Sequence, residues 1–208
     1  MSSHSLILYE CPETRSDRVK FLLEEIALPY EKKTLQLSKG EHKSGEYLAI
    51  NPIGSVPFLI DKDAGISLSE SGAICHYLAK NFKHNLYFPE DIKTLSHYDE
   101  MMFFATSTLD PICYQIFFHS KKYPPEKRVP AILELNIQRF DDCVQYLNKT
   151  LEKYAYALGN KLSAPDFIIA PTLLCIKEEV KKYPLIQKYI ENILELPSMK
   201  KVRNQTKS

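Results

Sequence analysis

The first 37 residues alternate between strand-like and helix-like spacing of their apolar positions. Leu6–Tyr9 is a short apolar run that predicts a strand, and Tyr30–Leu37 predicts a second one. Between them, Asp17–Ile26 carries apolar side chains three and four positions apart, which predicts an amphipathic helix. The residues on its apolar face are Val19, Leu22, Leu23 and Ile26.

A polar segment, Lys39–Gly45, follows and is expected to be a loop. After it, an apolar strand is entered through Val56-Pro57, and Asp61–Gly65 is a polar turn that predicts a hairpin. A helix should come next, with Ser69 or Ser71 as its N-cap. The resulting order, β-α-β, loop and β-β-α, predicts a thioredoxin-like sandwich.

The second half of the chain shows helical periodicity throughout. Prolines at 124, 125, 130, 184 and 197 separate the helical segments, as expected at helix boundaries. We therefore predict an α/β thioredoxin-like N-terminal domain (1–81), a packed linker (82–90) and an all-α C-terminal helical domain (91–208). The predicted helical segments are Ile92–Ser120, Val129–Tyr156, Ala164–Lys182 and Leu185–Leu194.

Composition narrows the classes of partner. Twenty-seven basic and 26 acidic side chains give a net charge of +1, which provides no field to attract nucleic acid or a membrane surface. No apolar stretch is long enough to span a bilayer, and the N-terminus lacks a secretory leader pattern. Five scattered cysteines without a C-x-x-C pair indicate free thiols. We expect a cytoplasmic protein whose partners are small molecules or proteins.

Two neighbouring segments, Asn51–Leu59 and Leu68–Ile74, carry the first sign of a binding site. Val56-Pro57 is an X-Pro bond, for which the cis form costs only about 0.5–1 kcal/mol. A cis bond there would leave the N–H and C=O of Val56 free for a ligand. The helix start at Glu70-Ser71 offers a carboxylate, a hydroxyl and orphan amides, which suit a small zwitterion.

A capping box is expected in the helical half. Ser163 can accept from the amide of Asp166, and Asp166 can reach back to the amide of Ser163. Leu162 can pack against Phe167 as a hydrophobic staple. This motif serves folding, not chemistry.

Taken together, these motifs resemble cytosolic glutathione transferases from Leu6 to about Met199. The resemblance is carried by Asn-Pro-x-Gly-x-Val-Pro from Asn51, by Glu70-Ser71 and by Gly-x-x-x-Ser-x-x-Asp from Gly159. Gly40–Ser44 and Asp110–Ile112 are most similar to the phi-like class, and theta-like enzymes share part of the pattern. The resemblance implies a glutathione-binding N-terminal domain and a homodimer.

The resemblance also implies how glutathione is held. Glu70 and Ser71 would bind the amine and carboxylate of the γ-glutamyl end, and the main chain at Val56-Pro57 would pair with the cysteinyl amide. His42 and Lys43 would bind the glycyl carboxylate. Glutathione is then a co-substrate, no bound cofactor is expected, and the histidines form no metal-ligand pattern.

Activation of the glutathione thiol needs a hydrogen-bond donor. A thiol with a pKa near 8.5 is only about 3% thiolate at pH 7, and lowering the pKa by two units requires about 2.7 kcal/mol. A hydroxyl donor to a charged sulfur supplies roughly 1.5–3 kcal/mol. Phi-like and theta-like enzymes use a serine here. Counting from Pro12 places Thr14 at that position, and counting back from Arg18 places Glu13 there. A glutamate cannot donate at neutral pH, so we predict Thr14 as the donor, with Ser16 as the close competitor.

Cys11-Pro12 supports a different chemistry. A cysteine before proline at this point resembles omega-like transferases and glutaredoxins, in which the cysteine forms a mixed disulfide. Tyr9 is a third possibility, because tyrosine-using classes place one at this strand end.

Three functions follow, in this order. The first is a glutathione S-transferase of the detoxification type, whose thiolate attacks a small hydrophobic electrophile or a peroxide beside the apolar helix Ile92–Ser120. The second is a glutathione-dependent thiol oxidoreductase that uses Cys11. The third is a non-catalytic protein-interaction module with the same fold.

Overall fold

The computed structural model describes residues 5–82 and 84–206. The chain divides into two compact units. The first comprises the described residues of Met1–Asn85 together with those of Leu196–Ser208, and the second comprises Leu86–Glu195. Because the segment after Glu195 returns to the first unit, the helical unit is inserted within it in sequence.

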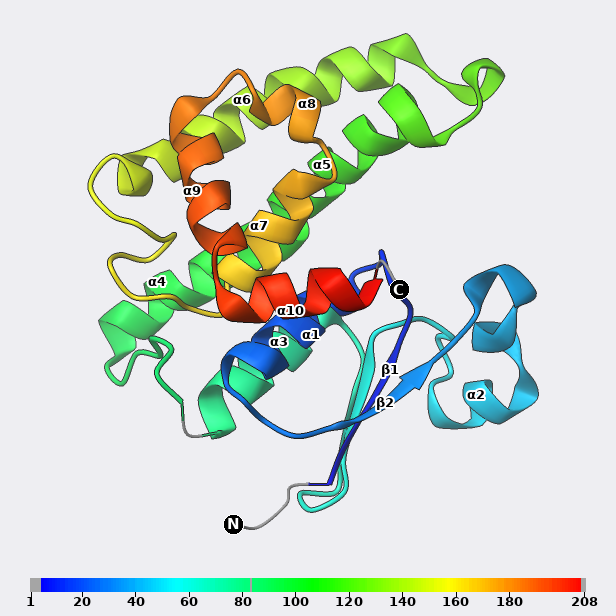
Figure 1. The fold of residues 1–208 in the computed structure, drawn as a ribbon. Helices are drawn as coiled ribbons and strands as arrows, with labels where there is room; N and C mark the ends of the chain where they lie inside the picture. The colour runs from blue at the N-terminus through cyan, green and yellow to red at the C-terminus, as the bar shows by residue number, and fades with distance from the viewer. Residues whose placement is uncertain (1–4, 83, 207–208) are drawn as a thin grey trace. The chain divides into compact units, whose positions relative to one another are not determined.

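The first unit is built on a four-stranded sheet with strand order β2-β1-β3-β4 (Figure 1). β1 pairs in parallel with β2 and antiparallel with β3, and β3 pairs antiparallel with β4. The strands are β1 Leu6–Glu10, β2 Glu31–Thr34, β3 Phe58–Asp61 and β4 Ile66–Leu68. β1 is buried except for half-buried Tyr9, as its apolar run predicts, whereas every residue of β2 is exposed.

Two helices pack together against this sheet, α1 (Ser16–Glu25) and α3 (Ser71–Asn81). On α1 the predicted apolar face is buried at Val19, Leu22 and Leu23, and on α3 Ile74 and Leu78 are fully buried. The β-α-β and β-β-α halves of the predicted sandwich are thus both present.

The connection between β2 and β3 differs from the sequence prediction. The second strand ends at Thr34 instead of Leu37, and the expected loop contains two 3₁₀ turns, η1 (Leu37–Lys39) and η2 (Glu41–Lys43). These lead into a short helix, α2 (Gly45–Ile50), whose N-cap Ser44 accepts from the Tyr47 amide at 3.2 Å. Local side-chain capping therefore orders a segment whose composition indicated a loop.

The second unit is helical, as predicted. Its first long segment is continuous but widens into π-helical turns at Phe104–Leu109 and Phe118–Lys122. The first of these turns directly precedes Pro111, whose missing N–H and bulky ring disturb regular α-helical bonding. The helices are α4 Ile92–Phe103, α5 Asp110–Phe117, α6 Pro130–Leu151, α7 Asp166–Leu174, α8 Lys177–Val180 and α9 Pro184–Leu194.

Prolines mark the starts of helices, as the sequence indicated. Pro130, Pro184 and Pro197 each begin a helix, and the single helix predicted over Ala164–Lys182 is divided into α7 and α8. The last helix, α10 (Pro197–Thr206), was not predicted. It packs against α1 in the first unit, where Met199 and Val202 are buried.

The capping box before α7 forms differently from the prediction. The Ser163 amide donates to Asp166 at 2.9 Å, as expected. However, the Ser163 hydroxyl donates to the Asp166 carboxylate at 2.7 Å instead of accepting from its amide, and the N-cap is Pro165. Asp166 also accepts from the Ala157 amide and the Tyr189 hydroxyl, each at 2.9 Å. The carboxylate is therefore the hub of a buried network, in addition to closing a helix end.

The aromatic residues near the predicted linker are packed. The Phe82 ring lies edge-on to Tyr77 in the first unit, with ring centroids 5.9 Å apart. In the second unit, the Tyr87 amide donates to the Leu162 carbonyl at 2.8 Å, and the Phe88 ring contacts Tyr98. The domain limits at 81 and 90 remain predictions.

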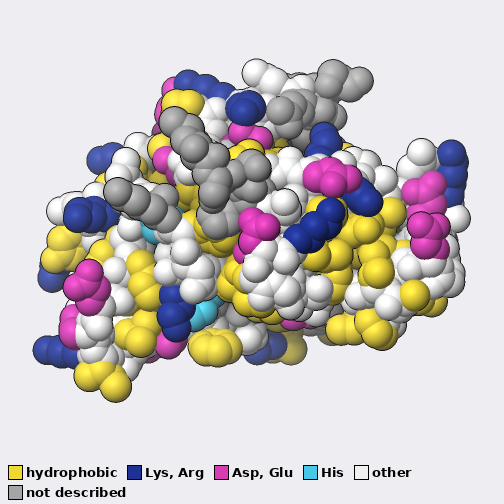
Figure 2. Space-filling view, turned by 90° about the horizontal axis from the view of Figure 1, so that it is seen from below, with side chains coloured by type: hydrophobic (Ala, Val, Ile, Leu, Met, Phe, Trp, Pro, Cys, Tyr) yellow, Lys and Arg dark blue, Asp and Glu magenta, His cyan; other side chains and the backbone are white. Residues whose placement is uncertain are grey.

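The surface carries both signs of charge. On the face seen in Figure 2, basic and acidic side chains are interspersed among apolar ones, in keeping with a net charge of +1. In the part of the chain that the structure describes, no helix is both long enough and apolar enough to cross a membrane.

Candidate functional site

The segment before β3 is held by two side chains from α2 and its end. The Tyr47 hydroxyl and the Asn51 amide both donate to the carbonyl of Ser55, at 2.6 and 2.8 Å. The Val56–Pro57 peptide bond is cis, as its sequence allowed. Among residues 5–82 and 84–206, the main-chain N–H and C=O of Val56 have no hydrogen-bond partner. The polar backbone of Val56 is therefore open to a ligand.

Gly54 brings the His42-Lys43 turn against this segment. A methyl group at Gly54 would lie 2.6 Å from the His42 carbonyl oxygen and 2.9 Å from Lys43 Nζ, and its φ of +60° also favours glycine. The Lys43 ammonium donates to the Ile53 carbonyl at 2.9 Å. Nδ1 of half-buried His42 is a buried atom without a hydrogen-bond partner in the described chain.

The start of α3 carries the second group of predicted residues. Neither Ser69 nor Ser71 caps the helix: the N-cap is Glu70, which makes no side-chain cap, and Ser71 is the first helical residue. Glu70 has a φ of +67°, a conformation that costs about 1–3 kcal/mol for a non-glycine residue and is concentrated at functional sites. Its exposed carboxylate makes no hydrogen bond or ion pair with the described residues.

Arg18 lies beneath this helix start and was not among the predicted site residues. It is only 4% exposed, and its guanidinium donates to the Ser71 hydroxyl oxygen at 3.2 Å. Because that oxygen accepts from Arg18, the Ser71 hydroxyl proton remains available to a ligand. A buried arginine next to orphan helix amides gives this end a positive potential that favours a carboxylate. The sequence signal that could have indicated Arg18 was its position in the Arg18-Val19 pair at the start of the predicted first helix.

The loop between β1 and α1 contains the candidate donors to a thiol. Thr14 is half-buried, and its Oγ1 lies 2.6 Å from the Cys11 carbonyl oxygen and 2.9 Å from Ser16 Oγ. Ser16 is fully buried and accepts from the Cys11 amide at 3.3 Å. Burial places Ser16 behind Thr14 and argues against direct contact between Ser16 and a ligand.

Cys11 and Tyr9 have other surroundings. Burial raises the pKa of the half-buried Cys11 thiol, and the Leu37 backbone hydrogen bond offsets this only in part. A raised pKa disfavours the reactive thiolate at neutral pH. Tyr9 alternates with Glu10 along β1, so it faces the opposite side of the sheet from α1, and its ring packs on Tyr47 and Phe58.

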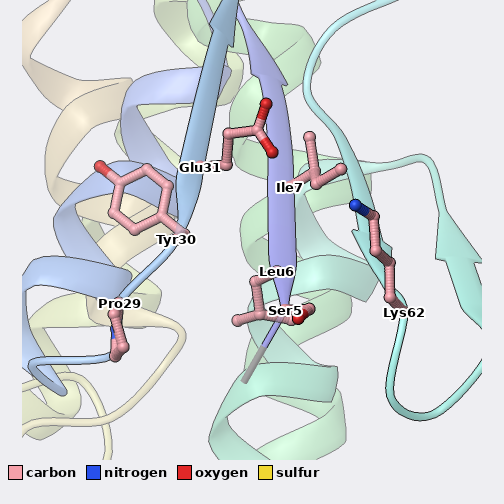
Figure 3. A pocket seen from close by; sticks show the side chains of 7 residues that line it. All are labelled: Ser5, Leu6, Ile7, Pro29, Tyr30, Glu31 and Lys62. Atoms are coloured by element: carbon pink, nitrogen blue, oxygen red, sulfur yellow. The ribbon is translucent and has the colours of Figure 1, made fainter. Parts of the chain in front are cut away.

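One open hollow of the first unit is lined by none of the predicted site residues (Figure 3). It is lined by the beginning of β1, the entry to β2 and Lys62 after β3, whereas the loop with Thr14 follows the other end of β1. Among the side chains that the structure places, no group of three His, Cys, Asp or Glu could hold a metal ion.

Comparisons with known proteins identify the family. The sequence models "Glutathione S-transferase, N-terminal domain" and "Glutathione S-transferase, C-terminal domain" match residues 4–80 and 113–205. The Aspergillus terreus "Glutathione S-transferase-like protein gedE" is 32% identical over 203 residues, which cover 89% of this chain and 88% of that protein. The chain belongs to the glutathione S-transferase family. A rice protein, "Probable glutathione S-transferase GSTF2", is 29% identical over 89% of each chain, in keeping with the phi-like resemblance.

Among solved structures, the glutathione transferase URE2P6 of Phanerochaete chrysosporium is similar over 99% of this chain and 98% of its own. It is 26% identical, has a TM-score of 0.85 and was determined in complex with oxidized glutathione. The predicted fold class, a thioredoxin-like unit with an all-α helical unit, is confirmed as that of this family.

Proposed function

We propose that this glutathione S-transferase family member is a catalytic transferase that activates the glutathione thiol for attack on a small hydrophobic electrophile or a peroxide. The observation that carries the proposal is a set of polar groups without partners in the described chain. They are the Val56 main chain, the Glu70 carboxylate and His42 Nδ1. Only His42 Nδ1 is a buried atom, for which a missing partner is costly, whereas the half-buried Val56 main chain and the exposed Glu70 carboxylate are accessible to a polar ligand.

Each group suits one part of glutathione. The Glu70 carboxylate would accept from the γ-glutamyl ammonium, and the Ser71 hydroxyl and helix amides would donate to the adjacent carboxylate. The Val56 N–H and C=O would pair with the cysteinyl amide. His42 and Lys43 would bind the glycyl carboxylate, since the Lys43 ammonium keeps two further protons after donating to Ile53.

Thr14 is the proposed donor to the sulfur. The Thr14 hydroxyl donates to the Cys11 carbonyl at 2.6 Å, so its proton would rotate from that carbonyl to the sulfur when glutathione binds, while Ser16 can donate to Thr14 Oγ1. The thiol proton leaves to solvent, and the sulfur keeps the electron pair. With an aryl halide, that pair forms the new S–C bond and halide leaves with the electrons of the broken C–halogen bond.

The two alternatives have less support. The raised pKa of Cys11 weighs against its role as the nucleophile of a thiol oxidoreductase. A non-catalytic interaction module would need neither the Thr14 hydroxyl nor the unpaired polar groups of His42, Val56 and Glu70. We further propose a cytoplasmic location, which suits the free thiols Cys11, Cys75, Cys113, Cys143 and Cys175, and a homodimeric assembly.

The test is retention on immobilised glutathione together with turnover of a generic aryl halide. Wild type should bind and turn over. Thr14→Val should bind with similar affinity but lower kcat about 10–100-fold, because it loses a hydrogen bond of roughly 1.5–3 kcal/mol to a charged sulfur. Thr14→Ser, which keeps the hydroxyl, should retain most activity.

The same assay separates the alternatives. Ser16→Ala and Cys11→Ser should remain active conjugating enzymes. If the wild type neither binds nor turns over, the interaction-module function replaces this proposal. If only Cys11→Ser is inactive and the activity is disulfide reduction, the protein is a thiol oxidoreductase.

A further inference from the structure

A cluster of three charges, of which Glu10 and Lys20 are buried and Asp17 is half-buried, adjoins the loop that carries Thr14. The Lys20 ammonium is 2.8 Å from the Glu10 carboxylate and 2.8 Å from the Asp17 carboxylate. Glu10 is 0% exposed and Lys20 is 4% exposed. The Thr34 hydroxyl donates to the other oxygen of Glu10. None of these residues contributes to the proposed glutathione contacts.

Such a cluster is a poor device for stability alone. Removing charges from water costs several kcal/mol per ion, and well-packed apolar residues often stabilise a site equally well or better. Three charges at this position therefore suggest a function that depends on how they are arranged.

The cluster joins both ends of the loop from Cys11 to Arg15. Glu10 is the last residue of β1, and Asp17 is the second residue of α1. Asp17 also accepts from the Glu13 amide at 3.0 Å, and Glu13 has a φ of +59°. Lys20 is the cation that both carboxylates share. Its charge therefore holds the strand end, the helix start and the turn directly before Thr14 in one arrangement.

We propose that Lys20 is a positioning residue for thiol activation, which fixes the Thr14 loop by bridging Glu10 at the strand end and Asp17 at the helix start. The inference rests on the proposed function, because it acts through the Thr14 hydroxyl. Small displacements of a group that stabilises a reacting atom reduce rates strongly, by as much as 100-fold for about 1 Å.

The charge of Lys20 should lower the pKa of a bound thiol, as should its positioning of the Thr14 loop. Glu10 and Asp17 raise the pKa of the Cys11 thiol in this loop, and Lys20 lowers it. A sulfur bound at Thr14 would be exposed to the same three charges. Arg18, on the same helix, is turned toward Ser71, and Glu70 lies at the start of α3. Loss of Lys20 leaves two carboxylates uncompensated and should raise the pKa of the bound thiol.

The experiment measures glutathione affinity, the pKa of the bound thiol from the ultraviolet absorbance of its thiolate, and kcat for an aryl halide against pH. In Lys20→Met, we expect affinity within about threefold of wild type and a pKa of the bound thiol higher by about one unit. Below that pKa, kcat should then fall about tenfold. A role in stability alone would lower the melting temperature and leave the pH profile unchanged.

A second variant guards against misfolding. It also separates the effect of net charge on the thiol pKa from the effect of the lost bridge between Glu10 and Asp17. Glu10→Gln with Lys20→Met removes one complete ion pair, and the glutamine still accepts from Thr34. The pKa of the bound thiol should stay raised, because the bridge to Asp17 is still missing. A return to the wild-type pH profile would overturn the positioning role and leave only a charge effect.

Tyr77→Phe is the matched control. It removes the 2.8 Å hydrogen bond to buried Asp61 in the same unit, away from the loop, and should lower stability without moving the pH profile. Unchanged pH profiles in both Lys20 variants would refute the inference. An inactive wild type, or wild-type activity in Thr14→Val, would refute the proposed function instead.

Discussion

At the scale of single residues, the segment proposed to bind glutathione depends on one position without a side chain. Gly54 lets the His42-Lys43 turn approach the chain before the cis peptide, and its missing methyl is what makes room for the His42 carbonyl. The turn proposed to bind the glycyl end of glutathione is thus positioned by a close approach of the backbone at Gly54.

Gly54→Ala should therefore weaken glutathione binding. The new methyl would meet His42 and Lys43 atoms at under 3 Å and displace the turn. Loss of one charge-assisted contact corresponds to about a tenfold higher Kd, measurable by titration calorimetry. Gly65→Ala is the matched control, because Gly65 has a similar φ of +65° but open space around it. Equal losses of affinity in both variants would show that backbone strain alone, and not the displaced turn, is responsible.

The sequence indicated some site residues and could not indicate others. Val56-Pro57 and Glu70-Ser71 were predicted because proline geometry and helix starts leave local signatures. Glu10 and Lys20 left none, since a charged residue at a strand end or on a helix is usually solvated. Their burial results from packing between segments that are distant in sequence, which periodicity does not encode.

At the scale of elements, the network around Asp166 holds the start of α7. The carboxylate accepts from four donors: the amides of Ala157 and Ser163, and the hydroxyls of Ser163 and Tyr189. It therefore connects the loop before α7 with α9, which the sequence motif alone did not show.

Asp166→Asn should destabilise the fold more than its small change in shape suggests. An amide keeps one acceptor oxygen and turns an NH₂ group toward donors, which leaves buried donors unpaired at about 1–3 kcal/mol each. We expect a loss of about 3 kcal/mol in the free energy of unfolding by urea. Tyr189→Phe removes one donor only and should cost about 1 kcal/mol. A loss in Asp166→Asn no larger than that in Tyr189→Phe would contradict the hub role.

Helices and strands could be predicted where the local sequence determines where they begin and end. The helices beginning at Pro130 and Pro184 follow from proline at the first helical position. The sequence pattern did not predict α10, because most of its residues are polar. Its buried apolar residues are Met199 and Val202. The exposed β2 is shorter than the apolar residues at its two ends indicated. The residues after it form 3₁₀ turns that lead into α2, which Ser44 caps.

At the scale of the whole molecule, charge and surface favour small ligands and protein partners. We predict a homodimer, on the basis of the family resemblance, and exposed apolar side chains such as Ile53, Ile92 and Phe103 are compatible with one. Light scattering should give twice the 24.0 kDa of the chain. A mass equal to that of one chain would refute this prediction.

The return of α10 to the first unit also has a consequence for protein synthesis. Nascent chains fold from the N-terminus as they are made, at about 5–20 residues per second. The surface of α1 that Met199 and Val202 cover must wait while the inserted helical unit is translated. Translation of that unit, Leu86–Glu195, takes about 5–22 s at these rates. The first unit is thus begun first and completed last, and a chaperone would have its longest access at the uncovered α1.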